Sequence, residues 1–516
     1  MTATTAMTAT PRSGHRRHKI VLYNPQAVFF TMPLALITVA SHLDPERYEV
    51  VIVDGRLAPN PAAAFAELTA QLDGALCLGV TVLTGAPIGD AVAASRAAKA
   101  YRPELPVIWG GWHPSMFGRE CLAEPSVDVT VQGQGEVTFA EIVERLADGR
   151  SLAGCPGCAY RDPRGLAGGS GSSRAAGGAK AVTVGNADDE ATAPPRLNPP
   201  RPLADVNTLR PHDFSLIDVE RYFKLKGKRQ LDYISSQGCA FRCAFCADPF
   251  VYQRKWTGLE PERVGAELDA LWQRHRFADV NFQDETFFTY AHRVEAIADQ
   301  LISRRLPITW AATMRADQGQ RLSEDVFAKC KRSGLRRLLI GVESGSQEMM
   351  DRIKKDIKLE QVFDVAERCR RHGVAVHFPF IVGFPEESDD SIRATLEVVK
   401  RLRAMSPDFQ TPIFYFKPYP GSSITDQAVA RGFRLPATLD EWSAFDFVGS
   451  IGPWVGPEKY RLIERFKFFQ QLAWDPCRPW SRPLRALARW RCSRDFYAAP
   501  IEQRVANLLR PAARLS

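Results

Sequence analysis

The sequence predicts an α/β protein in which a doubly wound parallel sheet is followed by a partial (β/α)6 barrel and a small, mainly helical C-terminal region. Two separate runs of alternating strand-like and helix-like segments predict the two sheets. A Gly-, Ala- and Ser-rich stretch without apolar periodicity separates the runs, and a Trp- and Arg-rich segment follows the second. The predicted parts are a disordered leader (1–18), a first domain (19–160), a disordered insertion (161–205), a barrel (206–425) and a C-terminal helical region (426–516).

The first run contains five short apolar segments that are typical of buried parallel strands. These strands are expected at 19–25, 48–55, 75–85, 106–111 and 127–136, with helices at 33–43, 61–72, 88–101 and 138–149. The alternation is typical of a Rossmann-like domain. The first strand ends in "YNPQAVFF", so the Gly-x-Gly-x-x-Gly fingerprint of dinucleotide binding is missing.

The second run contains six strand candidates in about 190 residues, which favours a partial TIM-type barrel. They lie at 231–236, 278–284, 308–314, 336–342, 374–382 and 410–417, with helical patterns between them, for example at 261–275 and 360–373. In such barrels the loops that follow the carboxyl ends of the strands carry the chemistry.

Composition places the chain among soluble globular proteins, with 45% hydrophobic and 24% charged residues in 516. The net charge of +8 is mild for this length, so we expect no nucleic-acid partner. No stretch approaches 18 consecutive apolar residues, and the N-terminal "MTATTAMTATPRSGHRRHK" has no apolar core of a secretory signal. Eleven cysteines, an odd number with one cluster, fit a reducing cytoplasm.

That cluster, "GCAFRCAFCADP" at 238–249, places three cysteines in the loop after the first barrel strand. Iron–sulfur clusters normally take one thiolate per iron. Cys239, Cys243 and Cys246 on a four-iron cluster would leave one iron open, and a metal with an open position can bind a small molecule. A zinc site could instead combine this loop with Cys155 and Cys158, but that pair adjoins the insertion and we expect it to be incidental.

The Cys-x3-Cys-x2-Cys spacing, with Phe245 before the last cysteine, resembles the signature of radical S-adenosylmethionine (SAM) enzymes. The resemblance implies a [4Fe–4S] cluster whose open iron is chelated by SAM, and an electron that cleaves SAM to methionine and a 5′-deoxyadenosyl radical. "NFQDETFF", "ATMRAD", "IGVESGSQ", "FIVGFPEE" and "FKPYPGS" resemble family segments after the later strands. The implied SAM contacts are Phe245, Asp284, Glu285, Arg315, Glu343 and Ser344.

The first domain resembles the cobalamin-binding domain that precedes the barrel in one branch of these enzymes, through "TMPLALITVASHL", "VDGR", "GGWHPS" and "QGQGE". The resemblance covers residues 19–425 apart from the insertion. The implied cobalamin contacts are Thr84, Gly110, Gly111, His113, Gln132, Gly133, Gly135 and Glu136. The Asp-x-His-x-x-Gly motif that gives cobalt a histidine elsewhere is absent; His113 could approach the corrin instead, or be a turn residue.

The branch includes methyltransferases and the anaerobic tetrapyrrole cyclase. It therefore implies transfer of a methyl group to an unactivated carbon of a small-molecule or lipid-like substrate, or alternatively a radical cyclisation without methyl transfer. It also implies a reductant such as flavodoxin or ferredoxin, and no catalytic side chain beyond the cluster ligands. A non-catalytic iron–sulfur redox protein is the alternative of another class, although Arg315 and Glu343 would then have no purpose.

The C-terminal region combines tryptophans with arginines, which predicts one of two arrangements. A basic amphipathic surface could rest on a membrane, or a helical cap could pack its aromatic side chains against the barrel mouth. The residues concerned are Trp474, Trp480, Trp490, Arg478, Arg482, Arg485 and Arg489.

Overall fold

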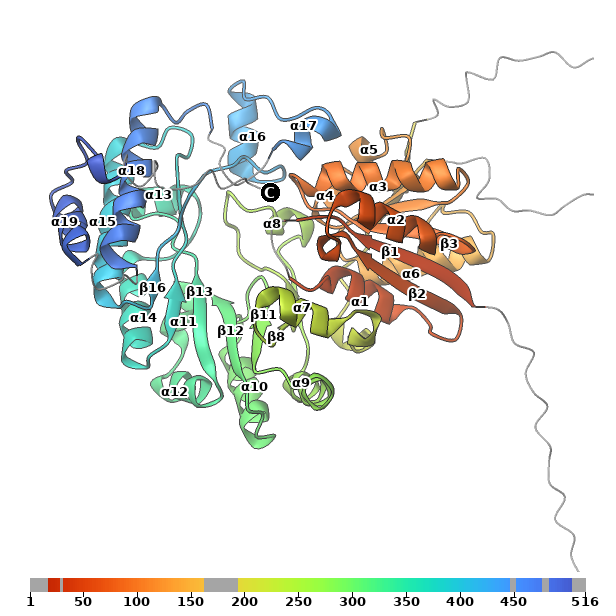
Figure 1. The fold of residues 1–516 in the computed structure, drawn as a ribbon, viewed down its shortest axis with the longest axis horizontal. Helices are drawn as coiled ribbons and strands as arrows, with labels where there is room; N and C mark the ends of the chain where they lie inside the picture. Colours follow the sequence, from red (N-terminus) through yellow and green to blue (C-terminus); the bar gives the residue numbers. More distant parts are fainter. Residues whose placement is uncertain (1–16, 28–30, 162–193, 446–451, 476–481, 504–516) are drawn as a thin grey trace, which may run out of the picture.

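The computed structural model describes residues 17–27, 31–161, 194–445, 452–475 and 482–503. Figure 1 shows the two predicted sheets side by side, with the N-terminal domain in red and orange and the barrel in green and cyan. Most of the predicted leader and insertion lie outside the described residues, as do Arg478 and Trp480.

The N-terminal domain is built on a seven-stranded sheet of order β2-β1-β3-β4-β5-β6-β7. Its strands are β1 (His18–Asn24), β2 (Tyr48–Asp54), β3 (Ala75–Thr81), β4 (Val107–Gly110), β5 (Val129–Val131), β6 (Cys158–Tyr160) and β7 (Arg196–Leu197). The pairs among β1–β5 are parallel, and β6 and β7 add antiparallel pairs at one edge. The five predicted strands are therefore confirmed, but the ranges 75–85 and 127–136 were too long, because β3 ends at Thr81, β5 ends at Val131, and residues 135 and 136 already belong to a helix.

Helices cover both faces of this sheet, which explains why its central strands are continuous apolar runs. Side chains alternate across a strand, so Ile20 and Leu22 of β1 pack with α1 (Leu34–His42) and α6 (Gly135–Ala147). Val21 and Tyr23 pack on the other face, which is covered by the helices α2 (Pro61–Gln71) and α3 (Pro87–Tyr101). Two short helices, α4 (Trp112–Met116) and α5 (Gly118–Cys121), follow β4.

The predicted insertion is too long at its C-terminal end. Strand β7 lies inside the range 161–205 and pairs antiparallel with β6, through Ala159↔Leu197 and Tyr160↔Arg196. A strand of two residues has no periodicity that a sequence pattern could detect. Residues 194–205 then lead to the barrel through the helix α7 (Val219–Lys226).

The barrel is an open six-stranded parallel sheet of order β16-β14-β13-β12-β11-β8. Its strands are β8 (Gln230–Tyr233), β11 (Asp279–Phe282), β12 (Thr309–Met314), β13 (Leu335–Ile340), β14 (Ala375–His377) and β16 (Phe409–Gln410). The connecting helices are α9 (Pro261–His275), α10 (Ala291–Ser303), α11 (Ala316–Arg321), α12 (Glu324–Arg332), α13 (Gln347–Arg352), α14 (Leu359–Arg371) and α15 (Asp389–Met405). In Figure 1 the long helices line the outside of the curved sheet.

The last two predicted strands are each broken in two. The range 374–382 becomes β14 and β15 (Phe380–Val382), and 410–417 becomes β16 and β17 (Ile413–Tyr415). Pro379 and Pro412 lie at the breaks, where the missing N–H of proline interrupts the hydrogen-bond ladder. Strands β15 and β17 pair with each other as a separate two-stranded sheet.

The C-terminal region is helical, as predicted, and contacts both domains. It contains α16 (Ser423–Ala430), α17 (Leu439–Ser443), α18 (Pro457–Trp474) and α19 (Arg482–Ser493). Helix α17 packs on α3 of the N-terminal domain, whereas α18 packs on α15 at the outside of the barrel and carries α19 (Figure 1). Among the described residues, no helix combines the length and the apolar character that crossing a bilayer requires.

Candidate functional site

The three cysteines lie together in one loop between the first barrel strand and the first barrel helix. A short strand, β9 (Ser236–Gly238), separates them from β8 and pairs antiparallel with β10 (Trp256–Gly258). Cys239 follows β9 directly, and Cys243 and Cys246 come before the helix α8 (Asp248–Val251). All three are free thiols, with Cys239 buried and the other two half-buried.

The thiols are close enough to influence one another's ionisation. Burial raises the pKa of Cys239 to about 11, with further contributions from Asp248 and Cys243. Burial, Asp248 and both other thiols raise the pKa of Cys246 well above its usual value. Thiolates at these positions therefore need a positively charged partner, and a metal that coordinates a thiol deprotonates it outright.

The donor set consists of three thiols in one loop, and thiolates are the ligands of iron–sulfur clusters. Among the residues that the structure describes, no three His, Cys, Asp or Glu side chains gather around one ion. A four-iron cluster binds each thiolate at a different iron, so its ligands lie further apart than those of a zinc ion. Cys155 and Cys158 are buried in the core of the N-terminal domain, where Cys158 Sγ donates to the carbonyl of Cys155 over 3.3 Å.

Arg315 lies against the cysteine loop. Its guanidinium stacks 3.8 Å from the ring centroid of Phe241, and its Nη1 lies 3.6 Å from Cys243 Sγ. The side chain is buried and is held by Asp317 Oδ1 at 2.9 Å from Nε. A guanidinium in this place could bind a carboxylate beside the cysteine loop, and the predicted SAM contact of Arg315 stays a prediction.

Glu343 follows β13 and forms a buried ion pair that the sequence did not reveal. Its Oε1 accepts a hydrogen bond from Lys355 Nζ at 2.8 Å, and both side chains are buried. The backbone of Glu343 adopts a φ of 69°, which is uncommon outside glycine. Because the carbonyl of Lys355 also accepts from Arg315 Nη2 at 2.5 Å, the three residues form one polar group beside the cysteine loop.

Ser344 and Phe245 contact other residues of the barrel. Ser344 Oγ is buried, lies 3.3 Å from Thr395 Oγ1 and accepts from Ser346 N at 3.1 Å. Phe245 packs edge-to-face on Phe384, next to a small apolar cluster under the loop.

The adjacent acids Asp284 and Glu285 do not share one role. Asp284 is buried and accepts from Ser235 N, Ser235 Oγ and Ser236 Oγ at 2.5–2.8 Å. These bonds use both of its oxygens to fix the turn between β8 and β9. Neighbouring residues after a strand point in different directions, and Glu285 instead lines a cavity between the two domains.

The Glu285 side chain in this cavity has an oxygen atom without a hydrogen-bond partner. Of the residues that line it, only Glu285 has a buried side-chain oxygen or nitrogen, Oε2, without a hydrogen bond. Burial raises the pKa of the Glu285 carboxyl to about 8, helped by the nearby carboxylates of Asp248 and Asp284. The carboxyl is therefore mainly neutral at pH 7 and can donate a hydrogen bond.

This raised pKa predicts that the difference in thermal stability between the wild type and Glu285→Gln changes with pH. The stability that the neutral carboxyl contributes is complete below its ordinary pKa of 4.5 and is lost as the pH rises through about 8. The loss can reach ~1.4 kcal/mol per pH unit, whereas an amide does not titrate. Thermal unfolding measured from pH 5 to 8.5 should therefore show a melting-temperature advantage of the variant that grows with pH; parallel curves would contradict it.

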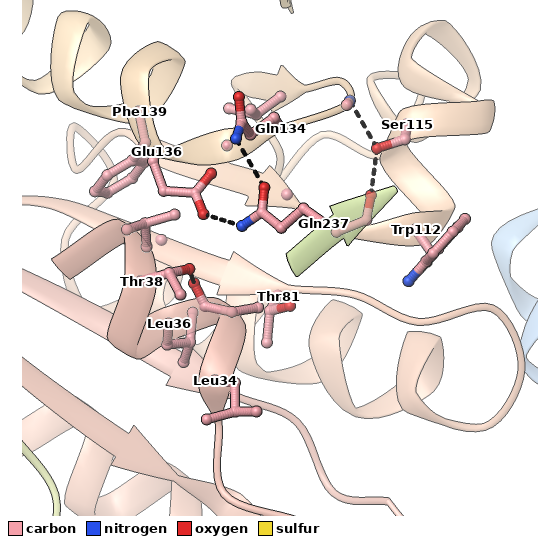
Figure 2. A pocket seen from close by; sticks show the side chains of 18 of the residues that line it. Leu34, Leu36, Thr38, Thr81, Trp112, Ser115, Gln134, Glu136, Phe139 and Gln237 are labelled. Carbon is pink, nitrogen blue, oxygen red and sulfur yellow. Dashed lines mark hydrogen bonds between the residues drawn. The ribbon is translucent and has the colours of Figure 1, made fainter. Parts of the chain in front are cut away.

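The cavity itself lies where the carboxyl ends of β1, β3, β4 and β5 face the barrel. It has a volume of ≈ 260 Å³ and is partly open to solvent. Its deep end is apolar, with Leu22, Gly79, Ile108, Val131 and Phe139 around it. Figure 2 shows its polar residues, Thr38, Ser115, Gln134, Glu136 and Gln237, between the loops after the strands and the barrel.

Five of the eight predicted cobalamin contacts line this cavity: Gly110, Gly111, Gly133, Gly135 and Glu136. Two of the glycines, Gly110 and Gly133, leave the backbone open to a ligand. A Cβ on Gly133 would meet no atom closer than 3.9 Å, and one on Gly110 none closer than 3.8 Å. A flat, bulky ring system can therefore approach the main chain of the loops after β4 and β5.

The other three residues predicted to contact cobalamin do not line this cavity. His113 is fully buried against Phe117 and Trp442, on the far side of its loop, and Thr84 Oγ1 lies 3.3 Å from its Nδ1. Burial lowers the pKa of His113 to about 4, so it is neutral. Gln132 turns back to Thr130, to which it donates over 2.8 Å.

The residues present fit cobalamin held without a protein histidine. The apolar depth of the cavity, its opening to solvent and the glycines along its loops suit a large ring, and no histidine is among the described residues that line it. Sequence reasoning missed Gln134, Gln237, Trp112 and Tyr252, which line the same cavity. Gln237 could have been suspected from its place two residues before Cys239. Gln134 and Trp112 lie inside the segments "QGQGE" and "GGWHPS", whereas Tyr252 has no distinguishing pattern.

Two family models match the chain. The model of the radical SAM superfamily matches residues 233–399, and that of the B12 binding domain matches residues 22–143. The two matched ranges contain the cysteine loop and the cavity-lining loops respectively. They support the expected [4Fe–4S] cluster, SAM and cobalamin as cofactors.

Curated relatives are methyltransferases and a cyclase. An uncharacterised methyltransferase of Pyrococcus horikoshii is 27% identical over 84% of this chain and 86% of its own length. The cytidylyl-2-hydroxyethylphosphonate methyltransferase of Streptomyces wedmorensis is 24% identical over 87% and 89% of the two chains. The anaerobic magnesium-protoporphyrin IX monomethyl ester cyclase of Rubrivivax gelatinosus is 24% identical over 67% of this chain and 57% of its own length.

Solved structures share the whole arrangement of domains. The radical SAM methyltransferase TsrM from Kitasatospora setae, with cobalamin and a [4Fe–4S] cluster bound, superposes with a TM-score of 0.64 at 17% identity, over 82% of this chain and 80% of that one. The cobalamin-dependent SAM radical enzyme OxsB, with aqua-cobalamin and SAM bound, gives a TM-score of 0.61 at 19% identity, over 81% and 55%. Both comparisons show a shared fold.

Proposed function

Since the chain belongs to the cobalamin-dependent radical SAM methyltransferase family, we propose that it transfers a methyl group to an unactivated carbon of a small-molecule or lipid-like substrate. The observation that carries this proposal is that the cysteine loop and the glycine-lined cavity adjoin. Gln237, two residues before Cys239, lines the cavity.

The cofactors supply the difficult chemistry when bound: reductive cleavage of SAM at the cluster provides a carbon radical, and cobalamin carries the methyl group. The protein holds and orients the reactants. In our proposal Cys239, Cys243 and Cys246 bind three irons, and Arg315 pairs with the SAM carboxylate beside the open iron. Lys355 compensates one oxygen of Glu343 and leaves the other for SAM.

The cavity wall on the barrel side would contact the substrate. Glu285 offers a neutral carboxyl, and Tyr252 packs edge-to-face on Trp112 at 5.9 Å between ring centroids. These groups suit a mainly apolar substrate with a neutral oxygen or nitrogen acceptor. We further propose that the electron comes from a small reductant such as flavodoxin or ferredoxin, because cleavage of SAM requires one electron for each turnover.

Product analysis tests this function against the cyclase-like alternative. The purified enzyme, loaded with both cofactors, would receive SAM with a deuterated methyl group, a strong reductant and a small-molecule and lipid extract of cells that lack the gene. Methyl transfer predicts S-adenosylhomocysteine and 5′-deoxyadenosine together, and one extract compound with the labelled methyl. Formation of 5′-deoxyadenosine with a changed but unlabelled compound would favour cyclisation.

We also propose that α19 rests on an anionic membrane. Leu484, Leu487 and Trp490 lie on one face of α19 and are 42%, 40% and 49% exposed. Phe496 and Ile501 extend the apolar surface. Exposed Arg482, Arg489 and Arg494 flank it, which matches the composition of interfacial helices. Trp474 contributes differently, because it packs against the barrel core.

Flotation with vesicles tests the membrane contact. We expect the protein to float with vesicles of mixed zwitterionic and anionic lipid, and Leu487→Glu to reduce the bound fraction about tenfold. Leu225→Glu is the matched control, because Leu225 is similarly exposed but lies on α7. Absence of the wild type from the floated fraction would end the proposal.

A further inference from the structure

One side-chain amide joins the cysteine loop to the loop that lines the glycine-rich end of the cavity. Gln237 Nε2 donates to Glu136 Oε1 at 2.7 Å, and Gln237 Oε1 accepts from Gln134 Nε2 at 2.7 Å. Figure 2 shows the three side chains in this chain of hydrogen bonds across the cavity. The orientation of the amide is unambiguous because the Glu136 carboxylate only accepts.

Both ends of this connection are anchored firmly. On the barrel side, Gln237 is paired with Thr257 in the β9–β10 ladder and is followed by Gly238 and then Cys239. On the N-terminal side, Gln134 precedes α6 and its Oε1 accepts from Ala204 N at 2.7 Å. A shift of the amide would therefore move either the first cluster ligand or the backbone of Gly133 and Gly135.

Several other hydrogen bonds between the domains lie away from the cysteines. Met32 N donates to Asp232 Oδ2 at 2.8 Å on β8, and Tyr222 of α7 donates to Asp54. These bonds hold the N-terminal domain to the start of the barrel. The bonds of Gln237 act instead two residues from Cys239, at the point where the two cofactor-binding loops meet.

We propose that Gln237 is a positioning residue that fixes the cluster-binding loop against the cobalamin-binding loop, and so sets the distance between the [4Fe–4S] cluster and cobalt. This inference rests on the cofactor pair of the proposed function. Methyl transfer through a substrate radical needs the substrate within bonding reach of both reagents, and a misplacement of about 1 Å can cost on the order of 100-fold in rate. A buried amide that is hydrogen-bonded at both its nitrogen and its oxygen is suited to hold such a distance.

The test exchanges the side chains at positions 136 and 237 and measures the distance between the two cofactors. Gln237→Glu would place a carboxylate against that of Glu136 and remove the donor, so the two side chains should separate. The double variant Glu136→Gln with Gln237→Glu restores every bond, because the amide introduced at position 136 and that of Gln134 both donate to the carboxylate at position 237. Tyr222→Phe is the matched control, which removes one hydrogen bond between the domains elsewhere.

The readout is the spin–spin distance between cob(II)alamin and the reduced cluster, each with one unpaired electron, measured by pulsed electron paramagnetic resonance. We expect a narrow distribution in the wild type, in Tyr222→Phe and in the double variant, and a shifted or broadened one in Gln237→Glu. The ratio of 5′-deoxyadenosine to S-adenosylhomocysteine should also rise roughly tenfold in Gln237→Glu.

The outcomes separate this inference from the proposed function. A wild-type protein that lacks either signal would overturn the cofactor pair. With both signals present, an unchanged distance in Gln237→Glu would overturn the role of Gln237 alone. If Gln237→Glu loses iron, the double variant decides: recovery of iron and distance supports the positioning role, and no recovery contradicts it.

Discussion

Replacing Cys243 with alanine is expected to abolish SAM cleavage while cobalamin binding persists. The loop would offer two thiolates in place of three, and the loss of one ligand leaves a second iron without protein support. We expect the formation of 5′-deoxyadenosine to fall by at least ~10³-fold, because the radical chemistry belongs to the cluster. The cavity is lined mostly by the N-terminal domain, so the corrin content should stay at the wild-type level.

The matched control for this variant is the double substitution Cys155→Ala and Cys158→Ala. This pair also has a short cysteine spacing but is buried in the core of the N-terminal domain. Truncating both thiols should reduce stability by roughly 1–2 kcal/mol and leave the iron content unchanged. Iron, sulfide and corrin analysis checks both variants; retained iron in Cys243→Ala, or lost iron in the control, would contradict the assignment of ligands.

Gly238→Ala is expected to prevent cluster incorporation although all three cysteines remain. Gly238 has a φ of +85°, and a Cβ there would lie 2.3 Å from the carbonyl oxygen of Lys255. That oxygen belongs to the backbone, so the neighbour cannot rotate away, and the β9–β10 pairing beside Cys239 must open. We expect a local cost of more than ~2 kcal/mol and an iron content below a tenth of the wild-type value.

Gly227→Ala provides the comparison. Gly227 ends α7 with a φ of +62°, but a Cβ there would meet no atom within 4 Å. Only the backbone strain of about 1 kcal/mol remains, so its melting temperature should fall slightly and its iron content should match the wild type. Equal iron in both glycine variants would show that the backbone at Gly238 does not shape the cluster loop.

The order of strands and helices could be predicted because apolar runs and helical periods alternate clearly in both domains. The ends of the strands were less predictable, and proline explains part of the difference between the predicted and the observed ends. Pro379 and Pro412 each interrupt a predicted strand, and both were visible in the sequence as residues without an N–H donor. The pairing of β7 with β6 could not be predicted, because two residues carry no pattern.

The cofactor loops could be predicted as segments, but the direction of single side chains could not. Asp284 and Glu285 are neighbours with different surroundings, and only the fold shows that one serves the turn and the other the cavity. His113 lies in the expected loop but faces Trp442, because a distant C-terminal helix covers that side. Lys355 comes from a loop without periodicity, so its bond to Glu343 had no sequence signal.

The cofactor content of the protein is the most direct measurement. The chain would be produced with cobalamin supplied, purified without oxygen, and analysed for iron, sulfide, zinc and corrin. Occupation of the cysteine loop and of the cavity in the same molecule predicts about four irons, about four sulfides and one corrin per chain. An iron-free protein loaded with zinc, or one with a full cluster and no corrin, would contradict the proposal that the two cofactors act together.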